Sequence, residues 1–270
     1  ATGAMNATWD ETAHFRNSYI IVSDDTVDWN QAAWSKYKGT MLSYNTLQEK
    51  KMCEEYMDNT ISEHMYNMDR GYSILPTARY GYIPFALGLK IALMLGATFS
   101  HAIICGKTVA LLFYTVLVGT AIMVAPGKKL LITILSLMPT FIFQGSMITY
   151  DGPIYAMMAL GVVLVMKEIS SESPINISRT IWAVVLLIVG SFSKAIYIPL
   201  LLLALLIPSS KIRTKKIKWS FIGMIILIML IVMSTFVLPT LTNTVAGNTD
   251  YGGDPRGGDT GAARQLLSML

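Results

Sequence analysis

Charged residues are scarce in this sequence: they make up 14% of its 270 residues, while 53% are hydrophobic. A water-soluble protein of this length needs more charge than residues 80–240 contain to cover its surface. The shortage therefore excludes one or two ordinary soluble domains and indicates a protein of the lipid bilayer. We expect an all-α fold, a polytopic transmembrane helical bundle whose core faces lipid.

Cysteines and strong net charge are also lacking. The two cysteines, Cys53 in a polar stretch and Cys105 in an apolar one, predict neither a disulfide framework nor a zinc site. The net charge is only +4 and the lysines cluster at predicted membrane edges, so nucleic acid is not an expected partner. No Gly-Lys-Ser/Thr motif follows the glycine-rich stretch 247–261, so we expect no nucleotide cofactor.

The chain divides into three predicted regions. Residues 1–78 form an extracytoplasmic loop region with amphipathic helices, residues 79–240 the transmembrane region, and residues 241–270 an extracytoplasmic glycine-rich loop. No signal peptide is recognisable in the first thirty residues, and we expect the chain to be truncated at both ends, with a preceding transmembrane helix missing. Only some apolar runs reach the roughly 20 residues of a perpendicular span; the runs are 84–97, 101–125, 130–148, 153–167, 180–193, 195–207 and 219–240.

Basic residues predict which side of the membrane each loop faces. Residues 209–219 hold five lysines and arginines and no acid, which places this loop in the cytoplasm. Lys128 with Lys129, and the stretch 167–179, are weaker cytoplasmic candidates. Helix 130–148 then runs outward and the next helix returns, so Asp151 faces the outside. The helix at 219–240 also runs outward, which places 241–270 outside. Residues 1–78 are expected outside as well, provided that the run 84–97 does not cross the membrane.

Two apolar runs need special treatment under this topology. Residues 180–207 must start and finish inside, which predicts two short helices meeting near Lys194 rather than one tilted helix. The run 84–97 is short and carries Lys90, so an interfacial or half-inserted helix paired with 101–125 is favoured over a full span.

Two acidic groups are candidates for chemistry. Asp10 is suited to cap a helix on which Glu11 and His14 share one face, although a capped amphipathic helix with solvated charges gives the same pattern. Asp151 lies at the outer end of two apolar helices, where a turn-forming Asp-Gly-Pro is the alternative explanation.

Two basic residues are candidates for anion binding. Lys194 lies inside an apolar run and needs a partner, a cavity or a bound anion, unless it is a lysine that snorkels at a helix end. Arg256 follows glycines that allow close approach of a ligand, and its planar fork suits phosphate. A flexible loop is the alternative for this second stretch.

Five pieces of the chain, in this order, resemble an uncharacterised family of predicted bacterial multi-pass membrane proteins that belongs with the GT-C glycosyltransferases. They are WDETAHF at 9–15, Arg79-Tyr80-Gly81-Tyr82-Ile83-Pro84, SMITYD at 146–151, SFSKAIYIP at 191–199 and GDPRGGD at 253–259. The resemblance implies a GT-C-like fold in the bacterial cytoplasmic membrane. The GT-C activity comes from the wider superfamily, and fold-level analogy does not demonstrate a function.

The resemblance also implies roles for particular residues. An acid on the first outer loop would correspond to Asp10 or Glu11, and an acid on the next outer loop to Asp151. Lys194 resembles the lysine that follows the mid-chain helix pair in many members. The residues assigned to substrate binding are, in chain order, His14, Arg79, Lys194 and Arg256.

The function implied is transfer of a sugar from a polyprenyl-phosphate carrier to a glycan acceptor on the outer side. Asp10 or Glu11 would be the general base, and Lys194 with Arg256 would stabilise the leaving phosphate. A divalent metal bridged by both N-terminal acids and Asp151 is a further option, without a committed ligand set. Membrane lipids are the remaining expected partners.

The alternative is a transporter or flippase of a lipid-linked glycan that breaks no bond, with the same charges lining its pathway. This alternative expects a repeated pair of broken helices. Only residues 180–207 look broken in the sequence, so the transferase is preferred.

Overall fold

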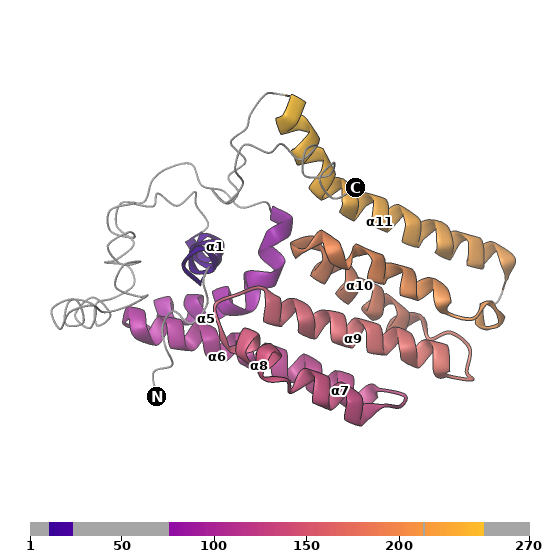
Figure 1. The fold of residues 1–270 in the computed structure, drawn as a ribbon, viewed down its shortest axis with the longest axis horizontal. Helices are drawn as coiled ribbons and strands as arrows, with labels where there is room; N and C mark the ends of the chain where they lie inside the picture. Colours follow the sequence, from indigo (N-terminus) through magenta and orange to yellow (C-terminus); the bar gives the residue numbers. More distant parts are fainter. Residues whose placement is uncertain (1–10, 24–75, 213, 246–270) are drawn as a thin grey trace.

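A computed structural model describes residues 11–23, 76–212 and 214–245, and this part of the chain is helical almost throughout, without a strand (Figure 1). The all-α prediction is confirmed for these residues. The elements are α1 (Glu11–Ser23), η1 (Pro76–Tyr82), α5 (Ile83–Met94), α6 (Phe99–Val124), α7 (Lys129–Ser136), α8 (Pro139–Ser146), α9 (Asp151–Ser170), α10 (Ile177–Ser193), η2 (Ala195–Leu206), η3 (Ser209–Lys211) and α11 (Lys215–Val245), where η marks a 3-10 helix.

Three helices of the described part are long and apolar enough to cross a membrane: Ser100–Val124, Asp151–Ser170 and Lys215–Thr235. Helices α7 and α8 together would make a fourth span. This span would be broken, because the two helices are bent by 58° where they meet. Ile177–Ser193 and Ile196–Leu206 are shorter apolar helices. The prediction of a membrane protein with several apolar helices is confirmed.

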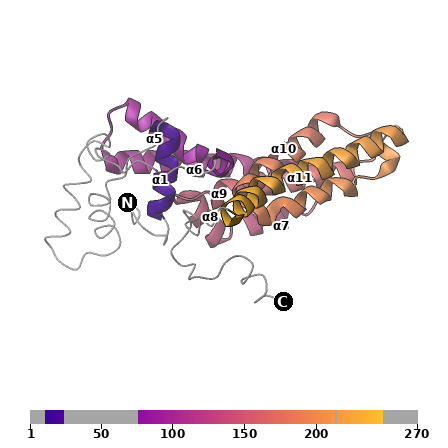
Figure 2. The ribbon, with the colours of Figure 1, turned by 90° about the horizontal axis from the view of Figure 1, so that it is seen from above.

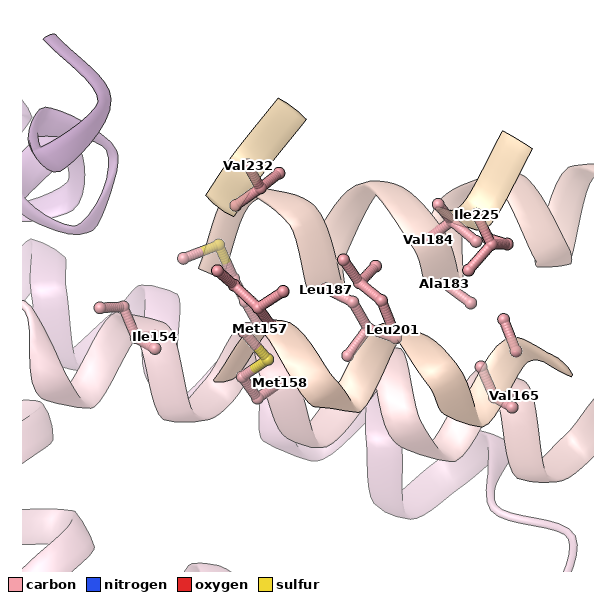
Figure 3. Close-up of a cluster of buried hydrophobic side chains, with 12 residues drawn as sticks. Ile154, Met157, Met158, Val165, Ala183, Val184, Leu187, Leu201, Ile225 and Val232 are labelled. Atoms are coloured by element: carbon pink, nitrogen blue, oxygen red, sulfur yellow. The ribbon is translucent and has the colours of Figure 1, made fainter. Parts of the chain in front are cut away.

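Helix α9 is the central element of the bundle. It packs against α6, α8, α10 and η2, and 61% of its most apolar stretch is buried, against 11% for α11. The cluster between α9, α10, η2 and α11 has Leu187 and Leu201 at its centre (Figure 3). Small residues allow the helices to come close, as membrane packing requires: a Cβ on Gly152 would lie 2.6 Å from the Cα of Gly145.

The break near Lys194 is confirmed. Helix α10 ends at Ser193, Lys194 itself is extended with φ −144° and ψ 113°, and η2 begins at Ala195. The second helix is unusual, because 3-10 helices longer than three or four residues are uncommon and this one has 12. Pro199 lies within it and has no amide hydrogen to donate.

Helix α5 corresponds to the short run 84–97. Phe85 and Leu89 are buried in one cluster with Ala102 and Ile103 of α6, which confirms the predicted pairing of the two segments. With 12 residues α5 is too short to cross a membrane by itself. Its half-inserted position stays a prediction.

The three basic loops lie at one end of the bundle: the loop before α7, the loop between α9 and α10, and the loop before α11 (Figure 1). We call this the basic-loop end. Asp151 and Lys194 lie at the other end, which we call the Lys194 end, and α1 and α5 lie on that side of the molecule (Figure 2). This arrangement agrees with the predicted topology, in which helices that run outward alternate with helices that return. Which end faces the cytoplasm stays a prediction.

Candidate functional site

Asp151 and Lys194 form an ion pair at the Lys194 end. The Lys194 Nζ lies 2.6 Å from the Asp151 Oδ1, with 34% and 25% of the two side chains exposed. Asp151 is the first residue of α9, where the positive end of the helix dipole stabilises a carboxylate. Its backbone NH donates to the Oγ1 of Thr149 at 3.2 Å. Two candidates that are distant in the sequence are therefore in direct contact.

Lys194 is held as a cation. Burial alone would lower the pKa of its ammonium, but the hydrogen bond and charge of Asp151, with Tyr150 and Tyr197, outweigh burial and raise the pKa above its ordinary value. Lys194 lies between two apolar helices and within neither. Its Nζ is also 5.1 Å from the centre of the Tyr150 ring, close enough for a cation–π interaction.

An aromatic bridge, which we define as His14, Tyr82 and Tyr150, connects this ion pair to α1. The Tyr150 ring meets Tyr82 and His14 edge to face, at 5.3 Å and 5.1 Å between centroids. The His14 Nδ1 and the Tyr82 hydroxyl are 2.8 Å apart, and the Nδ2 of Asn17 donates to the same hydroxyl at 3.1 Å. Helix α1, η1 and the start of α9 therefore meet beside Lys194.

Glycine at position 81 allows η1 to reach this place. A Cβ on Gly81 would lie 2.6 Å from the Cβ of Tyr150 and 3.1 Å from the Oγ of Ser193. Any other residue would push η1 away from α9 and α10. The backbone of η1 thus covers the junction that carries Lys194.

Three buried polar atoms in α1, η1 and α10 have no hydrogen-bond partner among the described residues. They are the Nε of Arg79, the Oγ of Ser193 and the Oδ1 of Asn17. A buried polar atom left unpaired costs about 1–3 kcal/mol, so such atoms usually meet water or a ligand. Ser193 immediately precedes Lys194, and Arg79 belongs to the 3-10 helix that covers it.

Comparison with known proteins gives a family but no activity. The family model described as "Predicted membrane protein (DUF2142)" matches residues 4–251. The chain belongs to this family. No curated protein and no solved structure matches it. The family description adds that the chain is a membrane protein, and it names no substrate or reaction.

In this DUF2142 chain the structure brings together some of the sequence-predicted site residues. Asp151 contacts Lys194, the Tyr150 ring lies between His14 and Lys194, and Arg79 belongs to η1. Glu11 is the first residue of α1, but its side chain lies outside the described part of the chain. Asp10 and Arg256 lie outside the described residues altogether, so the roles predicted for them stay predictions.

Tyr82, Tyr150, Asn17 and Ser193 are site residues that the sequence analysis did not select. Both tyrosines lie inside the pieces that carry the family resemblance, at 79–84 and 146–151. Tyrosine is also common at membrane edges as an interface anchor, so the sequence alone does not distinguish a site tyrosine from an anchor. Asn17 follows His14 by three residues and therefore lies on the same face of α1.

The described part of this DUF2142 chain holds no group of three histidine, cysteine or acidic side chains that could bind a metal. The predicted metal site needs Asp10 and Glu11 as well as Asp151, so it stays a prediction. What the described residues offer is an oriented cation with unpaired hydrogen-bonding atoms beside it, an arrangement suited to a phosphate or another anion.

Proposed function

We propose that this protein is a membrane glycosyltransferase-like protein that uses a polyprenyl-phosphate-linked sugar donor on the outer side of a bacterial cytoplasmic membrane. The Asp151–Lys194 ion pair is the observation that carries the proposal. It lies where apolar helices end, which is the depth at which a lipid-linked phosphate would lie. Because both side chains are partly exposed, a ligand can reach them.

Lys194 is the proposed phosphate-binding residue. A partly exposed ion pair contributes only about 0–1 kcal/mol, so exchange of the Asp151 carboxylate for a donor phosphate is inexpensive. Before the donor binds, Asp151 keeps the ammonium charged and directed toward the start of α9. The unpaired Nε of Arg79 and Oγ of Ser193 provide further donors for phosphate oxygens.

The reaction then follows from the charges. The acceptor hydroxyl attacks the anomeric carbon of the donor sugar, its proton passes to the carboxylate of Asp10 or Glu11, and the bond to the phosphate oxygen breaks. Lys194 and Arg256 stabilise the negative charge that the leaving phosphate gains.

The test is sugar transfer in membranes supplied with a lipid-linked donor. We expect Lys194→Gln to lower turnover by about a hundredfold, the size typical for loss of a group that stabilises developing charge. Lys90→Gln is the control, because Lys90 is an exposed lysine of α5 outside this ion pair. Full turnover in a folded Lys194→Gln protein would refute the assignment.

One observation favours the second candidate, a transporter or flippase. The α7–α8 pair, bent by 58°, joins α10–η2 as a second broken element. The Oγ of Ser136 at this bend is buried and has no hydrogen-bond partner among the residues that the structure describes, while Tyr114 donates to the Ser136 carbonyl at 2.6 Å.

The transferase remains preferred because transport sites lie near the bilayer midplane, and the charged residues of α9 and α10 lie only at their ends. Vesicles containing the protein and a fluorescent lipid-linked glycan separate the two functions. Movement of intact lipid between leaflets, without release of the sugar, would favour the transporter.

A further inference from the structure

The first turn of α11 presents lysines that have no partner in the described part of the protein. Lys215 and Lys216 are exposed, Lys218 is partly exposed, and the turn contains no acidic residue. None of the three forms an ion pair with a described residue. Ile217 and Trp219 in the same turn are also exposed, at 52% and 68%. We call residues 215–219 the lysine turn.

The electrostatics of this turn are unfavourable in the protein alone. The start of a helix carries the positive end of its dipole, so lysines there are destabilising unless an anion is near. Lys211, shortly before the turn, is different because its Nζ donates to the carbonyl oxygens of Glu168, Ile169 and Ser171. The charges of the lysine turn are therefore not neutralised by any residue that the structure describes.

The depth of the lysine turn follows from the rest of α11. The most apolar 18-residue window of Lys215–Thr235 has a mean hydropathy of 2.2, and only 11% of that window is buried. A helix so apolar and so little covered lies against lipid. The hydrocarbon core takes about 20 residues, so residues 219–240 cross it and the lysines lie at the level of the headgroups. The exposed indole of Trp219 suits the same level.

We propose that the lysine turn is a binding surface for anionic phospholipid headgroups of the leaflet at the basic-loop end. The ammonium groups of Lys215, Lys216 and Lys218 pair with headgroup phosphates, and Ile217 and Trp219 insert between headgroups and acyl chains. Each lysine near an anionic leaflet contributes about fivefold to the preference for anionic lipid. The surface is separate from the proposed sugar-transfer site, which lies at the other end of α9.

Quenching of Trp219 by brominated lipid tests this proposal in the full chain. The other four tryptophans are replaced by phenylalanine, at Trp9, Trp29, Trp34 and Trp182. The protein is placed in phosphatidylcholine nanodiscs with equal mole fractions of either brominated phosphatidylglycerol or brominated phosphatidylcholine. We expect phosphatidylglycerol to be enriched near Trp219 by roughly tenfold or more at low salt.

The combined change Lys215→Gln, Lys216→Gln and Lys218→Gln should make the two lipids quench equally and leave quenching by phosphatidylcholine unchanged, which also shows correct insertion. High salt should weaken the preference in the protein that keeps its lysines. Lys90→Gln should have no effect. If the triple variant does not insert into the membrane, the salt dependence of quenching in the protein that keeps its lysines takes its place as the test. Equal quenching by both lipids at low salt overturns the proposal and assigns the lysines to a soluble acidic partner.

Discussion

The two ends of α9 hold charged residues in opposite ways. At the basic-loop end Glu168 is fully buried, and its carboxylate accepts from the Nη1 of Arg179 at 2.7 Å and the backbone NH of Asn176 at 3.1 Å. Lys211 donates to the last carbonyls of the helix, where the dipole favours a cation. At this end the buried charge has its partners within the protein.

At the Lys194 end the charges are less fully paired. The Asp151–Lys194 pair is partly exposed, and buried atoms of Arg79, Asn17 and Ser193, in the elements that meet at this end, have no partner among the described residues. The same residue types thus serve two purposes. A buried charge with its hydrogen bonds filled fixes the fold, whereas an exposed pair beside unfilled donors is available to a ligand.

One segment connects the two ends, because Lys194 and Lys211 lie on either side of η2. Helix α9 has 20 residues and is about 30 Å long. The 12 residues of η2 span about 24 Å as a 3-10 helix, against about 18 Å as an α-helix. The 3-10 form therefore helps this segment to reach both ends of α9.

Replacement of Glu168 should give the largest loss of stability. Glu168→Ala leaves the Arg179 guanidinium and the Asn176 amide without their acceptor. We expect the free energy of unfolding to fall by about 3 kcal/mol. This value is at the lower end for a broken buried ion pair, because Arg179 is partly exposed. Thermal unfolding in nanodiscs measures it. Glu172→Ala is the matched control, since Glu172 is exposed in the adjacent loop. A loss equal to that of the control would contradict a structural role for the pair.

Replacement of Lys211 should have the second largest effect. Lys211→Met keeps the aliphatic stem but leaves the carboxyl-terminal carbonyls of α9 without their donor, which we expect to cost about 1–2 kcal/mol. Lys128→Met, at an exposed lysine of the same end of the bundle, should change stability by less than about 0.5 kcal/mol in the same unfolding measurement. Similar values for both would show that the carbonyl contacts contribute nothing.

Tyr82→Phe should have a smaller and local effect. It removes the hydroxyl that joins His14 and Asn17 to η1 and keeps the ring, so we expect a loss of about 1 kcal/mol. Hydrogen exchange should rise in α1 and stay unchanged in α9. Tyr197→Phe is the control. Unchanged exchange in α1 would mean that the helix is held by its other contacts, such as Phe15 with Phe85.

The sequence predicts the positions of the apolar helices and the break at Lys194, because a charge inside an apolar run leaves a clear signal. It does not predict that η2 is a 3-10 helix, since its almost wholly apolar sequence has no face that would distinguish the two helix types. The bend between α7 and α8 was missed within the run 130–148, although Pro139 marks it.

The candidate site is predicted only in part, for a physical reason. Asp151 and Lys194 are recognisable one by one as charges at the ends of apolar helices. The aromatic bridge depends on contacts such as that of His14 with Tyr82, 68 residues apart, and no periodic pattern announces such a contact. Burial of Glu168 was likewise unexpected, because a glutamate near a membrane edge is ordinarily solvated.

The smallest stability effect is expected for the residues proposed to matter most for function. Lys194→Gln and Asp151→Asn should each cost at most about 1 kcal/mol, because the pair is partly exposed. Since the pKa of Lys194 is raised, what stability the pair contributes is fully present at neutral pH and is lost only as the pH rises through that raised pKa. Unfolding measured at neutral and strongly alkaline pH checks both statements. A loss as large as that of Glu168→Ala would make this pair a structural lock like the one at the basic-loop end, and the proposed exchange of Asp151 for a donor phosphate would then be too costly.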